Sequence, residues 1–336
     1  MYQIPMQKIL PLIVFILISC RDQSAAPTLV PPPFTAYHTG SQTDVVAEPK
    51  GGICLMGGSR EDDSAMKWFM NQANGGDILV IRASGSDGYN DYMFSDVGVS
   101  INSVTSIVVK NKDASFHPHL RNKIEQAEGI WFAGGNQWKY VDYWKGTPVD
   151  SLIHDAVQNR NVVIGGTSAG LAILGEYIFS AENGTVTSSQ GLGNPYHERM
   201  TIDTFHFFTL PLLKGVITDS HYDERDRQGR HVAMMARIAK DKNILPKGIG
   251  IDERTAVTID ANGRAKVFGL GDVYFIRALG MPEVCVSGSP LTWNVNGQAL
   301  KVYTASTTSL FDLNDWAWGA GGEWGYWSVV DGVLKQ

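Results

Sequence analysis

A single hydroxyl stands among small residues in the stretch NVVIGGTSAGLAILGEY, residues 161–177. The apolar run before it is typical of a buried strand, and the pattern after Gly170 is typical of a helix. Ser168, between them, fits two interpretations. It caps the helix, or it is a nucleophile that a sharp turn of the pattern Gly-x-Ser-x-Gly presents at the end of a strand. A serine hydroxyl needs a neighbouring base to react, so the rest of a hydrolytic site must decide between the two.

His221 is the candidate base, because it directly follows the apolar run GVITDS, which predicts a strand. In parallel sheets, functional groups gather beyond the carboxyl ends of the strands. The residues that follow are densely charged and include Arg225, Arg227 and Arg230. The planar guanidinium binds carboxylates through two hydrogen bonds, so this cluster predicts recognition of a carboxylate. The alternative is a solvated charged loop that precedes a helix.

Two candidate acids end another short apolar run, in GIGIDERTA, where Asp252 and Glu253 stand side by side. Successive side chains of an extended segment point in opposite directions, so only one of the two can face an imidazole. The alternative is that the pair caps a turn. The order serine, histidine, acid differs from the order serine, acid, histidine of the α/β-hydrolases, which argues against an ordinary esterase.

The elements that must position these residues form a repeating pattern from residue 50 onwards. Short apolar runs, which predict strands, alternate with helical patterns. Strands that are apolar along their whole length indicate a parallel sheet covered on both faces, so the predicted fold class is doubly wound α/β with a mostly parallel sheet. The glycine-rich strand ends FAGGNQ and IGGTSAG are the expected walls of one site.

Neither a metal nor a cofactor is expected. The run GGICLMGG lacks the Gly-x-Gly-x-x-Gly spacing and the acidic partner of a dinucleotide site, and the cysteine spacing offers no zinc motif. The net charge is -6 without any basic block, which argues against binding of nucleic acid. Cys54 and Cys285 either pair or remain buried thiols, and the sequence leaves this open.

Both ends of the chain differ from its body. Residues 1–20 predict a signal peptide, because Lys8 precedes an apolar run too short to span a bilayer. The last four of these residues resemble a bacterial lipoprotein cleavage motif, which predicts lipidation of Cys20; the alternative is an ordinary signal peptide that contains a cysteine. Residues 21–49, rich in Pro, Ser, Thr and Ala, predict a flexible tether. We therefore expect an exported, membrane-anchored lipoprotein of the bacterial cell envelope.

The body of the chain predicts a catalytic domain over residues 50–284. Residues 285–336 are rich in Trp and Gly and show little helical period, so we expect a small β-rich extension. Its aromatic side chains are expected to pack on the main body; the alternative is that they bind sugar.

Four motifs in order, FAGGNQ, GGTSAG, TDSHYDERDRQGR and GIGIDERTA, resemble the cyanophycinase branch of the serine peptidases that also include dipeptidase E. The resemblance covers about residues 50 to 280. It implies a fold related to the class I glutamine amidotransferases, with serine at the turn where those enzymes have cysteine. It also implies a triad of Ser168, His221 and Glu253, and an oxyanion hole made by the backbone amides of Gly135 and Ala169.

The resemblance further assigns contacts with the substrate to residues around the expected base. These are Gln137, Asp219, Arg225, Arg227 and Arg230. Two positions depart from the family: Ser220, which we also expect to contact the substrate, stands where the family commonly has Gln, and Asn136 stands where Asp is common.

The resemblance implies hydrolysis of cyanophycin, a poly-aspartate that carries arginine on its side-chain carboxylates, through an acyl-enzyme on the serine. The products would be β-Asp-Arg dipeptides. One alternative is a dipeptidase E-like hydrolase of Asp-containing dipeptides, although the arginine-rich segment argues against it. Another is a non-catalytic lipoprotein that binds acidic polymers. A peptide or polymer substrate and a lipid anchor are the expected partners, and the sequence leaves open whether the chain forms a homodimer.

Overall fold

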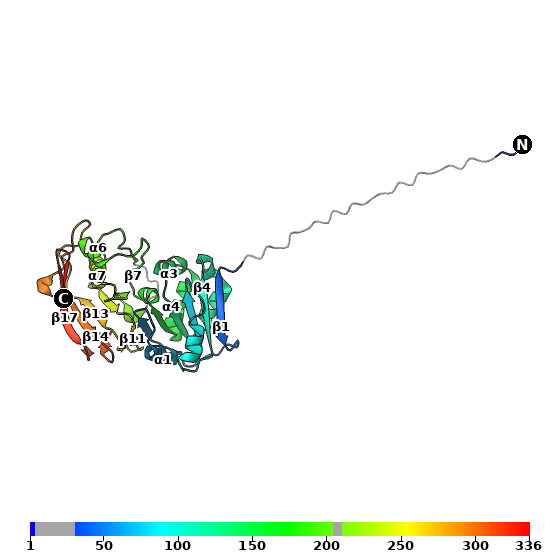
Figure 1. The fold of residues 1–336 in the computed structure, drawn as a ribbon, viewed down its shortest axis with the longest axis horizontal. Helices are drawn as coiled ribbons and strands as arrows, with labels where there is room; N and C mark the ends of the chain where they lie inside the picture. The colour runs from blue at the N-terminus through cyan, green and yellow to red at the C-terminus, as the bar shows by residue number, and fades with distance from the viewer. Residues whose placement is uncertain (4–30, 204–209) are drawn as a thin grey trace. The chain divides into compact units, whose positions relative to one another are not determined.

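The fold was derived from a computed structural model, which describes residues 1–3, 31–203 and 210–336. Residues 33–336 form one compact unit (Figure 1). Cys20, most of the predicted signal peptide and residues 21–30 of the predicted tether lie outside the described residues. Within the described ranges, no helix combines the length and apolar character that crossing a membrane requires.

The larger sheet contains ten strands, and five neighbouring strands at its centre run parallel. Nearly every residue of these five strands is buried, as their uninterrupted apolar runs predict. Antiparallel strands extend the sheet at both edges. In spatial order the strands are β1 (Phe34–Gly40), β4 (Ser103–Val109), β3 (Asp77–Arg82), β5 (Gly129–Phe132), β6 (Val163–Thr167), β2 (Ile53–Met56), β11 (Thr255–Ile259), β12 (Arg264–Gly269), β15 (Leu310–Asp312) and β16 (Gly319–Ala320).

Helices cover both faces of the parallel strands. Cys54 of β2 packs in one core with α1 (Asp63–Gln72), whereas its neighbour Leu55 packs in a second core on the opposite face. That second core includes buried residues of α2 (Pro118–Gln126), α3 (Gln137–Trp144) and α4 (Pro148–Arg160). Figure 1 shows α1 on the side of the sheet opposite α3 and α4. The predicted doubly wound α/β class is confirmed.

A second sheet of six strands carries the other part of the site. Its strands β9 and β10 run parallel, and all its other pairs are antiparallel. The sequence predicted one mostly parallel sheet for the main body, and the second sheet was missed. A local apolar pattern identifies a strand but not the strand with which it pairs. In spatial order the strands are β18 (Val333–Lys335), β17 (Glu323–Val330), β14 (Leu300–Ala305), β13 (Val273–Ala278), β10 (Lys247–Ile251) and β9 (Val216–Ser220). The long helix α7 (Gln228–Lys242) shares a core with these strands.

The C-terminal region is β-rich, as predicted, but it is built into this second sheet. Strand β14 pairs with β13 along its full length, and Trp293 and Trp327 are buried in the same core as α7. Several aromatic side chains of the region therefore pack on the main body, as expected. Trp318 and Trp324 remain partly exposed near the far edges of the sheets.

The predicted tether is wrong for residues 34–40. These residues form β1, which pairs with β4 in seven consecutive positions. Only Phe34 of the strand is buried, so ladder hydrogen bonds rather than apolar burial hold it. The β-favouring residues Phe34, Thr35, Tyr37 and Thr39 were the available signal, which the overall composition of residues 21–49 concealed. Cys54 and Cys285 are both free, buried thiols, and burial raises the pKa of each.

Short elements complete the unit. A small hairpin pairs β7 (Ile178–Phe179) with β8 (Ile202–Asp203). The remaining elements are the helices α5 (Ala169–Ala172) and α6 (Ser188–Gly193), the π-helix η1 (Tyr92–Asp96), and the 3-10 helices η2 (Lys112–Phe116), η3 (Pro211–Leu213) and η4 (Val295–Gly297).

Candidate active site

Ser168 occupies a sharp turn between β6 and α5. Its backbone angles, φ 54° and ψ -114°, lie in a region that residues with a side chain rarely adopt. The turn packs tightly on β5, because a Cβ atom at Gly170 would collide with the carbonyl of Phe132. The Ser168 side chain makes no capping hydrogen bond to α5. The helix-cap interpretation is therefore wrong, and the conformation is that of a turn which presents its hydroxyl.

His221 and Glu253 complete a chain of hydrogen bonds with this hydroxyl. The Ser168 Oγ atom lies 2.6 Å from Nε2 of His221, and Nδ1 of His221 lies 2.6 Å from Oε1 of Glu253. His221 directly follows β9, and Glu253 lies just beyond β10, the parallel neighbour of β9. The site thus joins the carboxyl ends of strands from two different sheets.

Asp252 faces away from the imidazole. Its carboxylate accepts hydrogen bonds from the backbone amides of Asp223, at 3.0 Å, and Asp272, at 2.9 Å. Burial raises the pKa of Asp252 to about 6. The geometry therefore selects Glu253 as the carboxylate that can orient His221, while Asp252 ties two loops together.

The surroundings favour the neutral form of His221. Burial lowers its pKa, the hydrogen bond to Glu253 acts in the opposite direction, and the nearby charges of Arg225 and Arg227 lower the pKa further. The hydrogen bond with His221 holds the pKa of Glu253 below its ordinary value. Near neutral pH, an ionised Glu253 thus faces an uncharged imidazole that can accept a proton.

The loop after β2 packs against His221, and the sequence reasoning missed its role. The His221 amide donates a hydrogen bond to the carbonyl of Gly57 at 2.9 Å. Gly58 adopts φ 108°, and a Cβ atom there would collide with the His221 ring. Glycine therefore allows both the backbone conformation and the close approach. The second glycine pair of GGICLMGG was the available signal, but it was considered only as a dinucleotide motif.

A cavity of about 890 Å³ opens in front of Ser168 and His221. Three arginines and three carboxylates line it, together with Tyr89 and Tyr92. The Tyr89 hydroxyl donates to Glu61 at 2.5 Å, and the Tyr92 hydroxyl donates to Asp63 at 2.8 Å. The charged lining residues are Arg60, Arg82, Arg225, Glu61, Asp63 and Asp96.

The sequence reasoning missed all of this charged wall except Arg225. Most of it lies in loops and at the starts of helices between residues 59 and 96, and it matches no motif. The charged run SREDD, which follows the two glycines after β2, was the available signal.

Gly135 and Ala169, the predicted oxyanion donors, both lie close to Ser168. Gly135 lines the cavity beside Ser168, and Ala169 is the first residue of α5. In the part of the chain that the structure describes, neither backbone amide donates a hydrogen bond. Their role as oxyanion donors stays a prediction.

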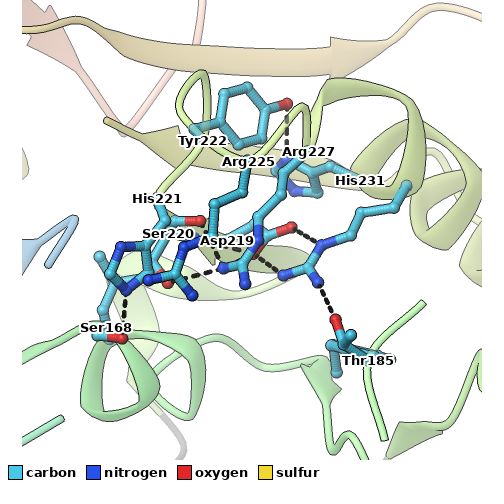
Figure 2. A network of polar contacts seen from close by, with 12 residues as sticks. Ser168, Thr185, Asp219, Ser220, His221, Tyr222, Arg225, Arg227 and His231 are labelled. Atoms are coloured by element: carbon cyan, nitrogen blue, oxygen red, sulfur yellow. Dashed lines mark hydrogen bonds and ion pairs between the residues drawn. The ribbon is translucent and has the colours of Figure 1, made fainter. Parts of the chain in front are cut away.

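The predicted substrate contacts divide into two groups. Arg225 lines the cavity, is half exposed, and places Nη2 3.6 Å from Oε1 of Glu253. The others are held by protein groups instead: Gln137 donates to the carbonyl of Phe179 at 2.5 Å, and the rest form a network behind His221 (Figure 2). The members of this network are Asp219, Ser220, Arg227 and Arg230. None of these five residues lines the cavity, so their positions do not support the predicted contact with substrate.

Among the described residues, no group of three or more His, Cys, Asp or Glu side chains is placed to hold a metal ion. A hydroxyl next to a neutral imidazole, which a carboxylate orients, can attack a carbonyl carbon as a nucleophile.

Comparison with known proteins finds two cyanophycinases among the relatives of this chain. The chain is 26% identical over 184 residues to a cyanophycinase of Trichormus variabilis, and the match covers 55% of this chain and 56% of that enzyme. It is 25% identical to a cyanophycinase of Thermosynechococcus vestitus over 237 residues, 68% of each chain. This chain thus matches little more than half the length of the first of these enzymes.

The fold resembles that of a peptidase from an acI-B1 Actinobacterium. The TM-score is 0.52 at 15% identity, and the match covers 79% of this chain and 98% of that one. Residues 55–267, which hold Ser168, His221 and Glu253, match the model of Peptidase family S51. The chain belongs to peptidase family S51, the family of serine peptidases that its four motifs resemble.

Proposed function

We propose that this protein is a serine-type peptidase that hydrolyses cyanophycin or similar β-aspartyl-arginine peptides. The observation that carries the proposal is the chain of two 2.6 Å hydrogen bonds from Ser168 through His221 to Glu253. The membership of family S51 and the names of the relatives support it.

The reaction follows from the geometry of these three residues. His221 takes the proton of the Ser168 hydroxyl as Oγ bonds to the scissile carbonyl carbon, and Glu253 stabilises the imidazolium that forms. The amides of Gly135 and Ala169 would bind the developing oxyanion. The imidazolium then donates its proton to the leaving amine, and the carbon–nitrogen bond breaks. Water, deprotonated by His221, hydrolyses the ester and restores Ser168.

The charges of the cavity support a substrate that carries both signs. A β-aspartyl-arginine unit has carboxylates and a guanidinium, and the cavity offers both arginines and carboxylates. Arg225 lies beside the hydrogen-bonded chain and suits a substrate carboxylate. Glu61 and Asp63, each bound by one tyrosine hydroxyl, retain free acceptor positions for a guanidinium.

An assay of the purified full chain on insoluble cyanophycin, with Ser168→Ala as the control, tests the proposal. We expect release of β-Asp-Arg by the wild-type protein alone. A parallel panel of α-linked Asp dipeptides separates this activity from a dipeptidase E-like one. Cyanophycin that is bound but not cleaved would instead support the non-catalytic alternative, and preference for the α-linked dipeptides would overturn the proposed substrate.

We also propose that the mature protein begins at a lipidated Cys20 and is anchored in the bacterial cell envelope. The proposal rests on the apolar run and the four residues that end at Cys20. The bacterial modification adds more than one acyl chain, which stable anchoring requires. Partition into a detergent phase should be lost in Cys20→Ala. Unchanged partition of that variant would contradict the anchor.

A further inference from the structure

His221 holds a backbone conformation that its own preferences do not favour. Its φ of 48° lies in the left-handed region, which residues other than glycine seldom occupy. Such a conformation persists where the surrounding contacts fix it. One contact is the hydrogen bond from the His221 amide to Gly57 in front. A second is the hydrogen bond from the Arg225 amide to the His221 carbonyl at 3.2 Å. Further contacts act from behind, through the preceding residue.

Both polar groups of the Ser220 backbone are fixed by charged side chains. Its amide donates to Oδ1 of Asp219 at 2.9 Å, and its carbonyl accepts a hydrogen bond from Nη1 of Arg227 at 2.7 Å. Figure 2 shows these side chains on the side of Ser220 away from Ser168. Because Ser220 directly precedes His221, the orientation of the Ser220 backbone determines where the His221 side chain projects from the end of β9.

Asp219 is itself immobilised by Arg230. Nε of Arg230 lies 2.7 Å from Oδ2 and Nη2 lies 2.5 Å from Oδ1, and the two residues are only 2% and 3% exposed. Burial alone would raise the pKa of Asp219, but the charge of Arg230 outweighs it and holds the pKa below its ordinary value. The third guanidinium nitrogen, Nη1, binds Oγ1 of Thr185 at 2.9 Å. All three nitrogens of this guanidinium therefore bind protein groups.

Arg225, which lies in the same segment as Arg230 (residues 222–230), has contrasting surroundings. Its side chain is 52% exposed, it lines the cavity, and its nearest charged partner is Glu253 at 3.6 Å. A guanidinium in this position can meet a substrate group. The guanidinium of Arg230 cannot do so without giving up both hydrogen bonds to the buried carboxylate of Asp219, which would keep only the 3.6 Å contact with Arg227.

We propose that Asp219, Arg227 and Arg230 are positioning residues that set the His221 imidazole against Ser168, and that they do not contact the substrate. This inference rests on the proposed function, because it assigns a purpose only if His221 activates Ser168. It gives these residues a role different from the one that the family resemblance implied.

The test separates activation of Ser168 from recognition of a peptide. A small uncharged fluorophosphonate reacts with an activated serine: the oxygen–phosphorus bond forms, fluoride leaves, and His221 takes the proton. The probe offers no carboxylate and no guanidinium. The rate of labelling is measured on the full chain for Asp219→Asn, Arg227→Gln and the matched control Arg225→Gln, beside kcat and KM on a β-Asp-Arg peptide.

We expect labelling and kcat to fall together, by about tenfold to a hundredfold, in Asp219→Asn and Arg227→Gln, with little change in KM. On the alkaline plateau of the pH profile, where His221 is neutral in both proteins, Arg225→Gln should keep its labelling rate and raise KM. Arg230→Lys should recover part of the activity that Arg230→Gln loses, since it keeps the charge but not the planar fork. If the first two variants label at the wild-type rate and raise KM instead, they contact the substrate and the inference is overturned.

Two controls keep the outcomes distinct. Thermal unfolding of Asp219→Asn is compared with that of the wild type. Arg227→Gln changes a side chain that is 14% exposed, so it should disturb the fold less than a change at the buried Asp219. A folded Arg227→Gln with wild-type labelling overturns the inference whatever happens to Asp219→Asn. Wild-type protein that the probe does not label at Ser168 overturns the proposed function as well, whereas labelling that Ser168→Ala abolishes supports that function separately.

Discussion

The charges in front of His221 and the charges behind it are built in opposite ways. In front, Arg225 shares an open cavity with Glu61 and Asp63. Behind, Asp219 and Arg230 are almost completely buried and bind each other through two contacts. An exposed pair contributes little to stability and stays free to meet a ligand, whereas a buried pair is expensive to break. Burial, more than charge, therefore decides which of these residues can take part in recognition.

The largest effect should come from loss of the hydrogen bond between Glu253 and His221. Glu253→Gln is expected to lower kcat by about a thousandfold or more, because an amide no longer stabilises the imidazolium. The matched control is its neighbour, Asp252→Asn, which keeps the imidazole contact intact. Steady-state kinetics on a β-Asp-Arg peptide compare the two. A large loss in Asp252→Asn with an active Glu253→Gln would reverse the assignment.

Unfolding by denaturant should show that the charges behind His221 contribute more to the stability of the fold than the charges in front of it. Asp219→Asn leaves Arg230 as an unpaired buried charge, and we expect it to lower the free energy of unfolding by about 3 kcal/mol or more. Arg225→Gln removes an exposed charge and should change it by about 1 kcal/mol at most. Equal losses in both variants would mean that burial does not distinguish the two regions.

The cavity wall should govern selectivity between substrates. Glu61→Gln and Asp63→Asn are expected to lower kcat/KM for a β-aspartyl-arginine substrate about tenfold, the equivalent of one charged hydrogen bond. An analogue with a neutral residue in place of arginine should lose much less. Competition between the two substrates in one assay measures the ratio. An unchanged ratio would place the arginine side chain outside this wall.

The smallest effect concerns pH. The pKa of His221 lies below its ordinary value, so the fall of kcat/KM on the acid side should occur at a pH below that of a free histidine. Arg225→Gln removes a nearby positive charge, which raises the pKa of His221 and shifts this fall to higher pH. Asp96→Asn is the matched control in the same cavity. A shift to lower pH in Arg225→Gln would contradict the sign.

The main elements of the fold could be predicted from the sequence, because each strand and helix carries its own pattern. Strands β2 to β6 are largely apolar and almost completely buried, and α1, α2 and α4 show amphipathic periods, so the doubly wound class followed. The division into two sheets could not be predicted. Strand β13 pairs with β10 and β14 rather than with its neighbour β12, and no local pattern records that choice. Strand β1 was missed because hydrogen bonds rather than apolar contacts hold it.

The site could be predicted only where its residues end strands. Ser168, His221 and Glu253 each follow a strand, and the structure brings them into contact. Glu61, Asp63 and Asp96 lie at the starts and ends of helices, so strand patterns gave no reason to place them in the same cavity. Arg225 and Arg230 have different surroundings because α7 begins between them, at Gln228. Arg230, within its first turn, faces Asp219, whereas Arg225, before the helix, faces the cavity.

Direct observation of an acyl group on Ser168 tests the central claim. The full chain would be mixed with a β-Asp-Arg peptide, quenched in acid within the first turnover, and digested for mass spectrometry of the peptide that contains residues 161–177. We expect the acyl mass on Ser168 in the wild type and in Arg225→Gln, and none in His221→Ala. Turnover that leaves Ser168 unmodified, and that persists in Ser168→Ala, would contradict the claim.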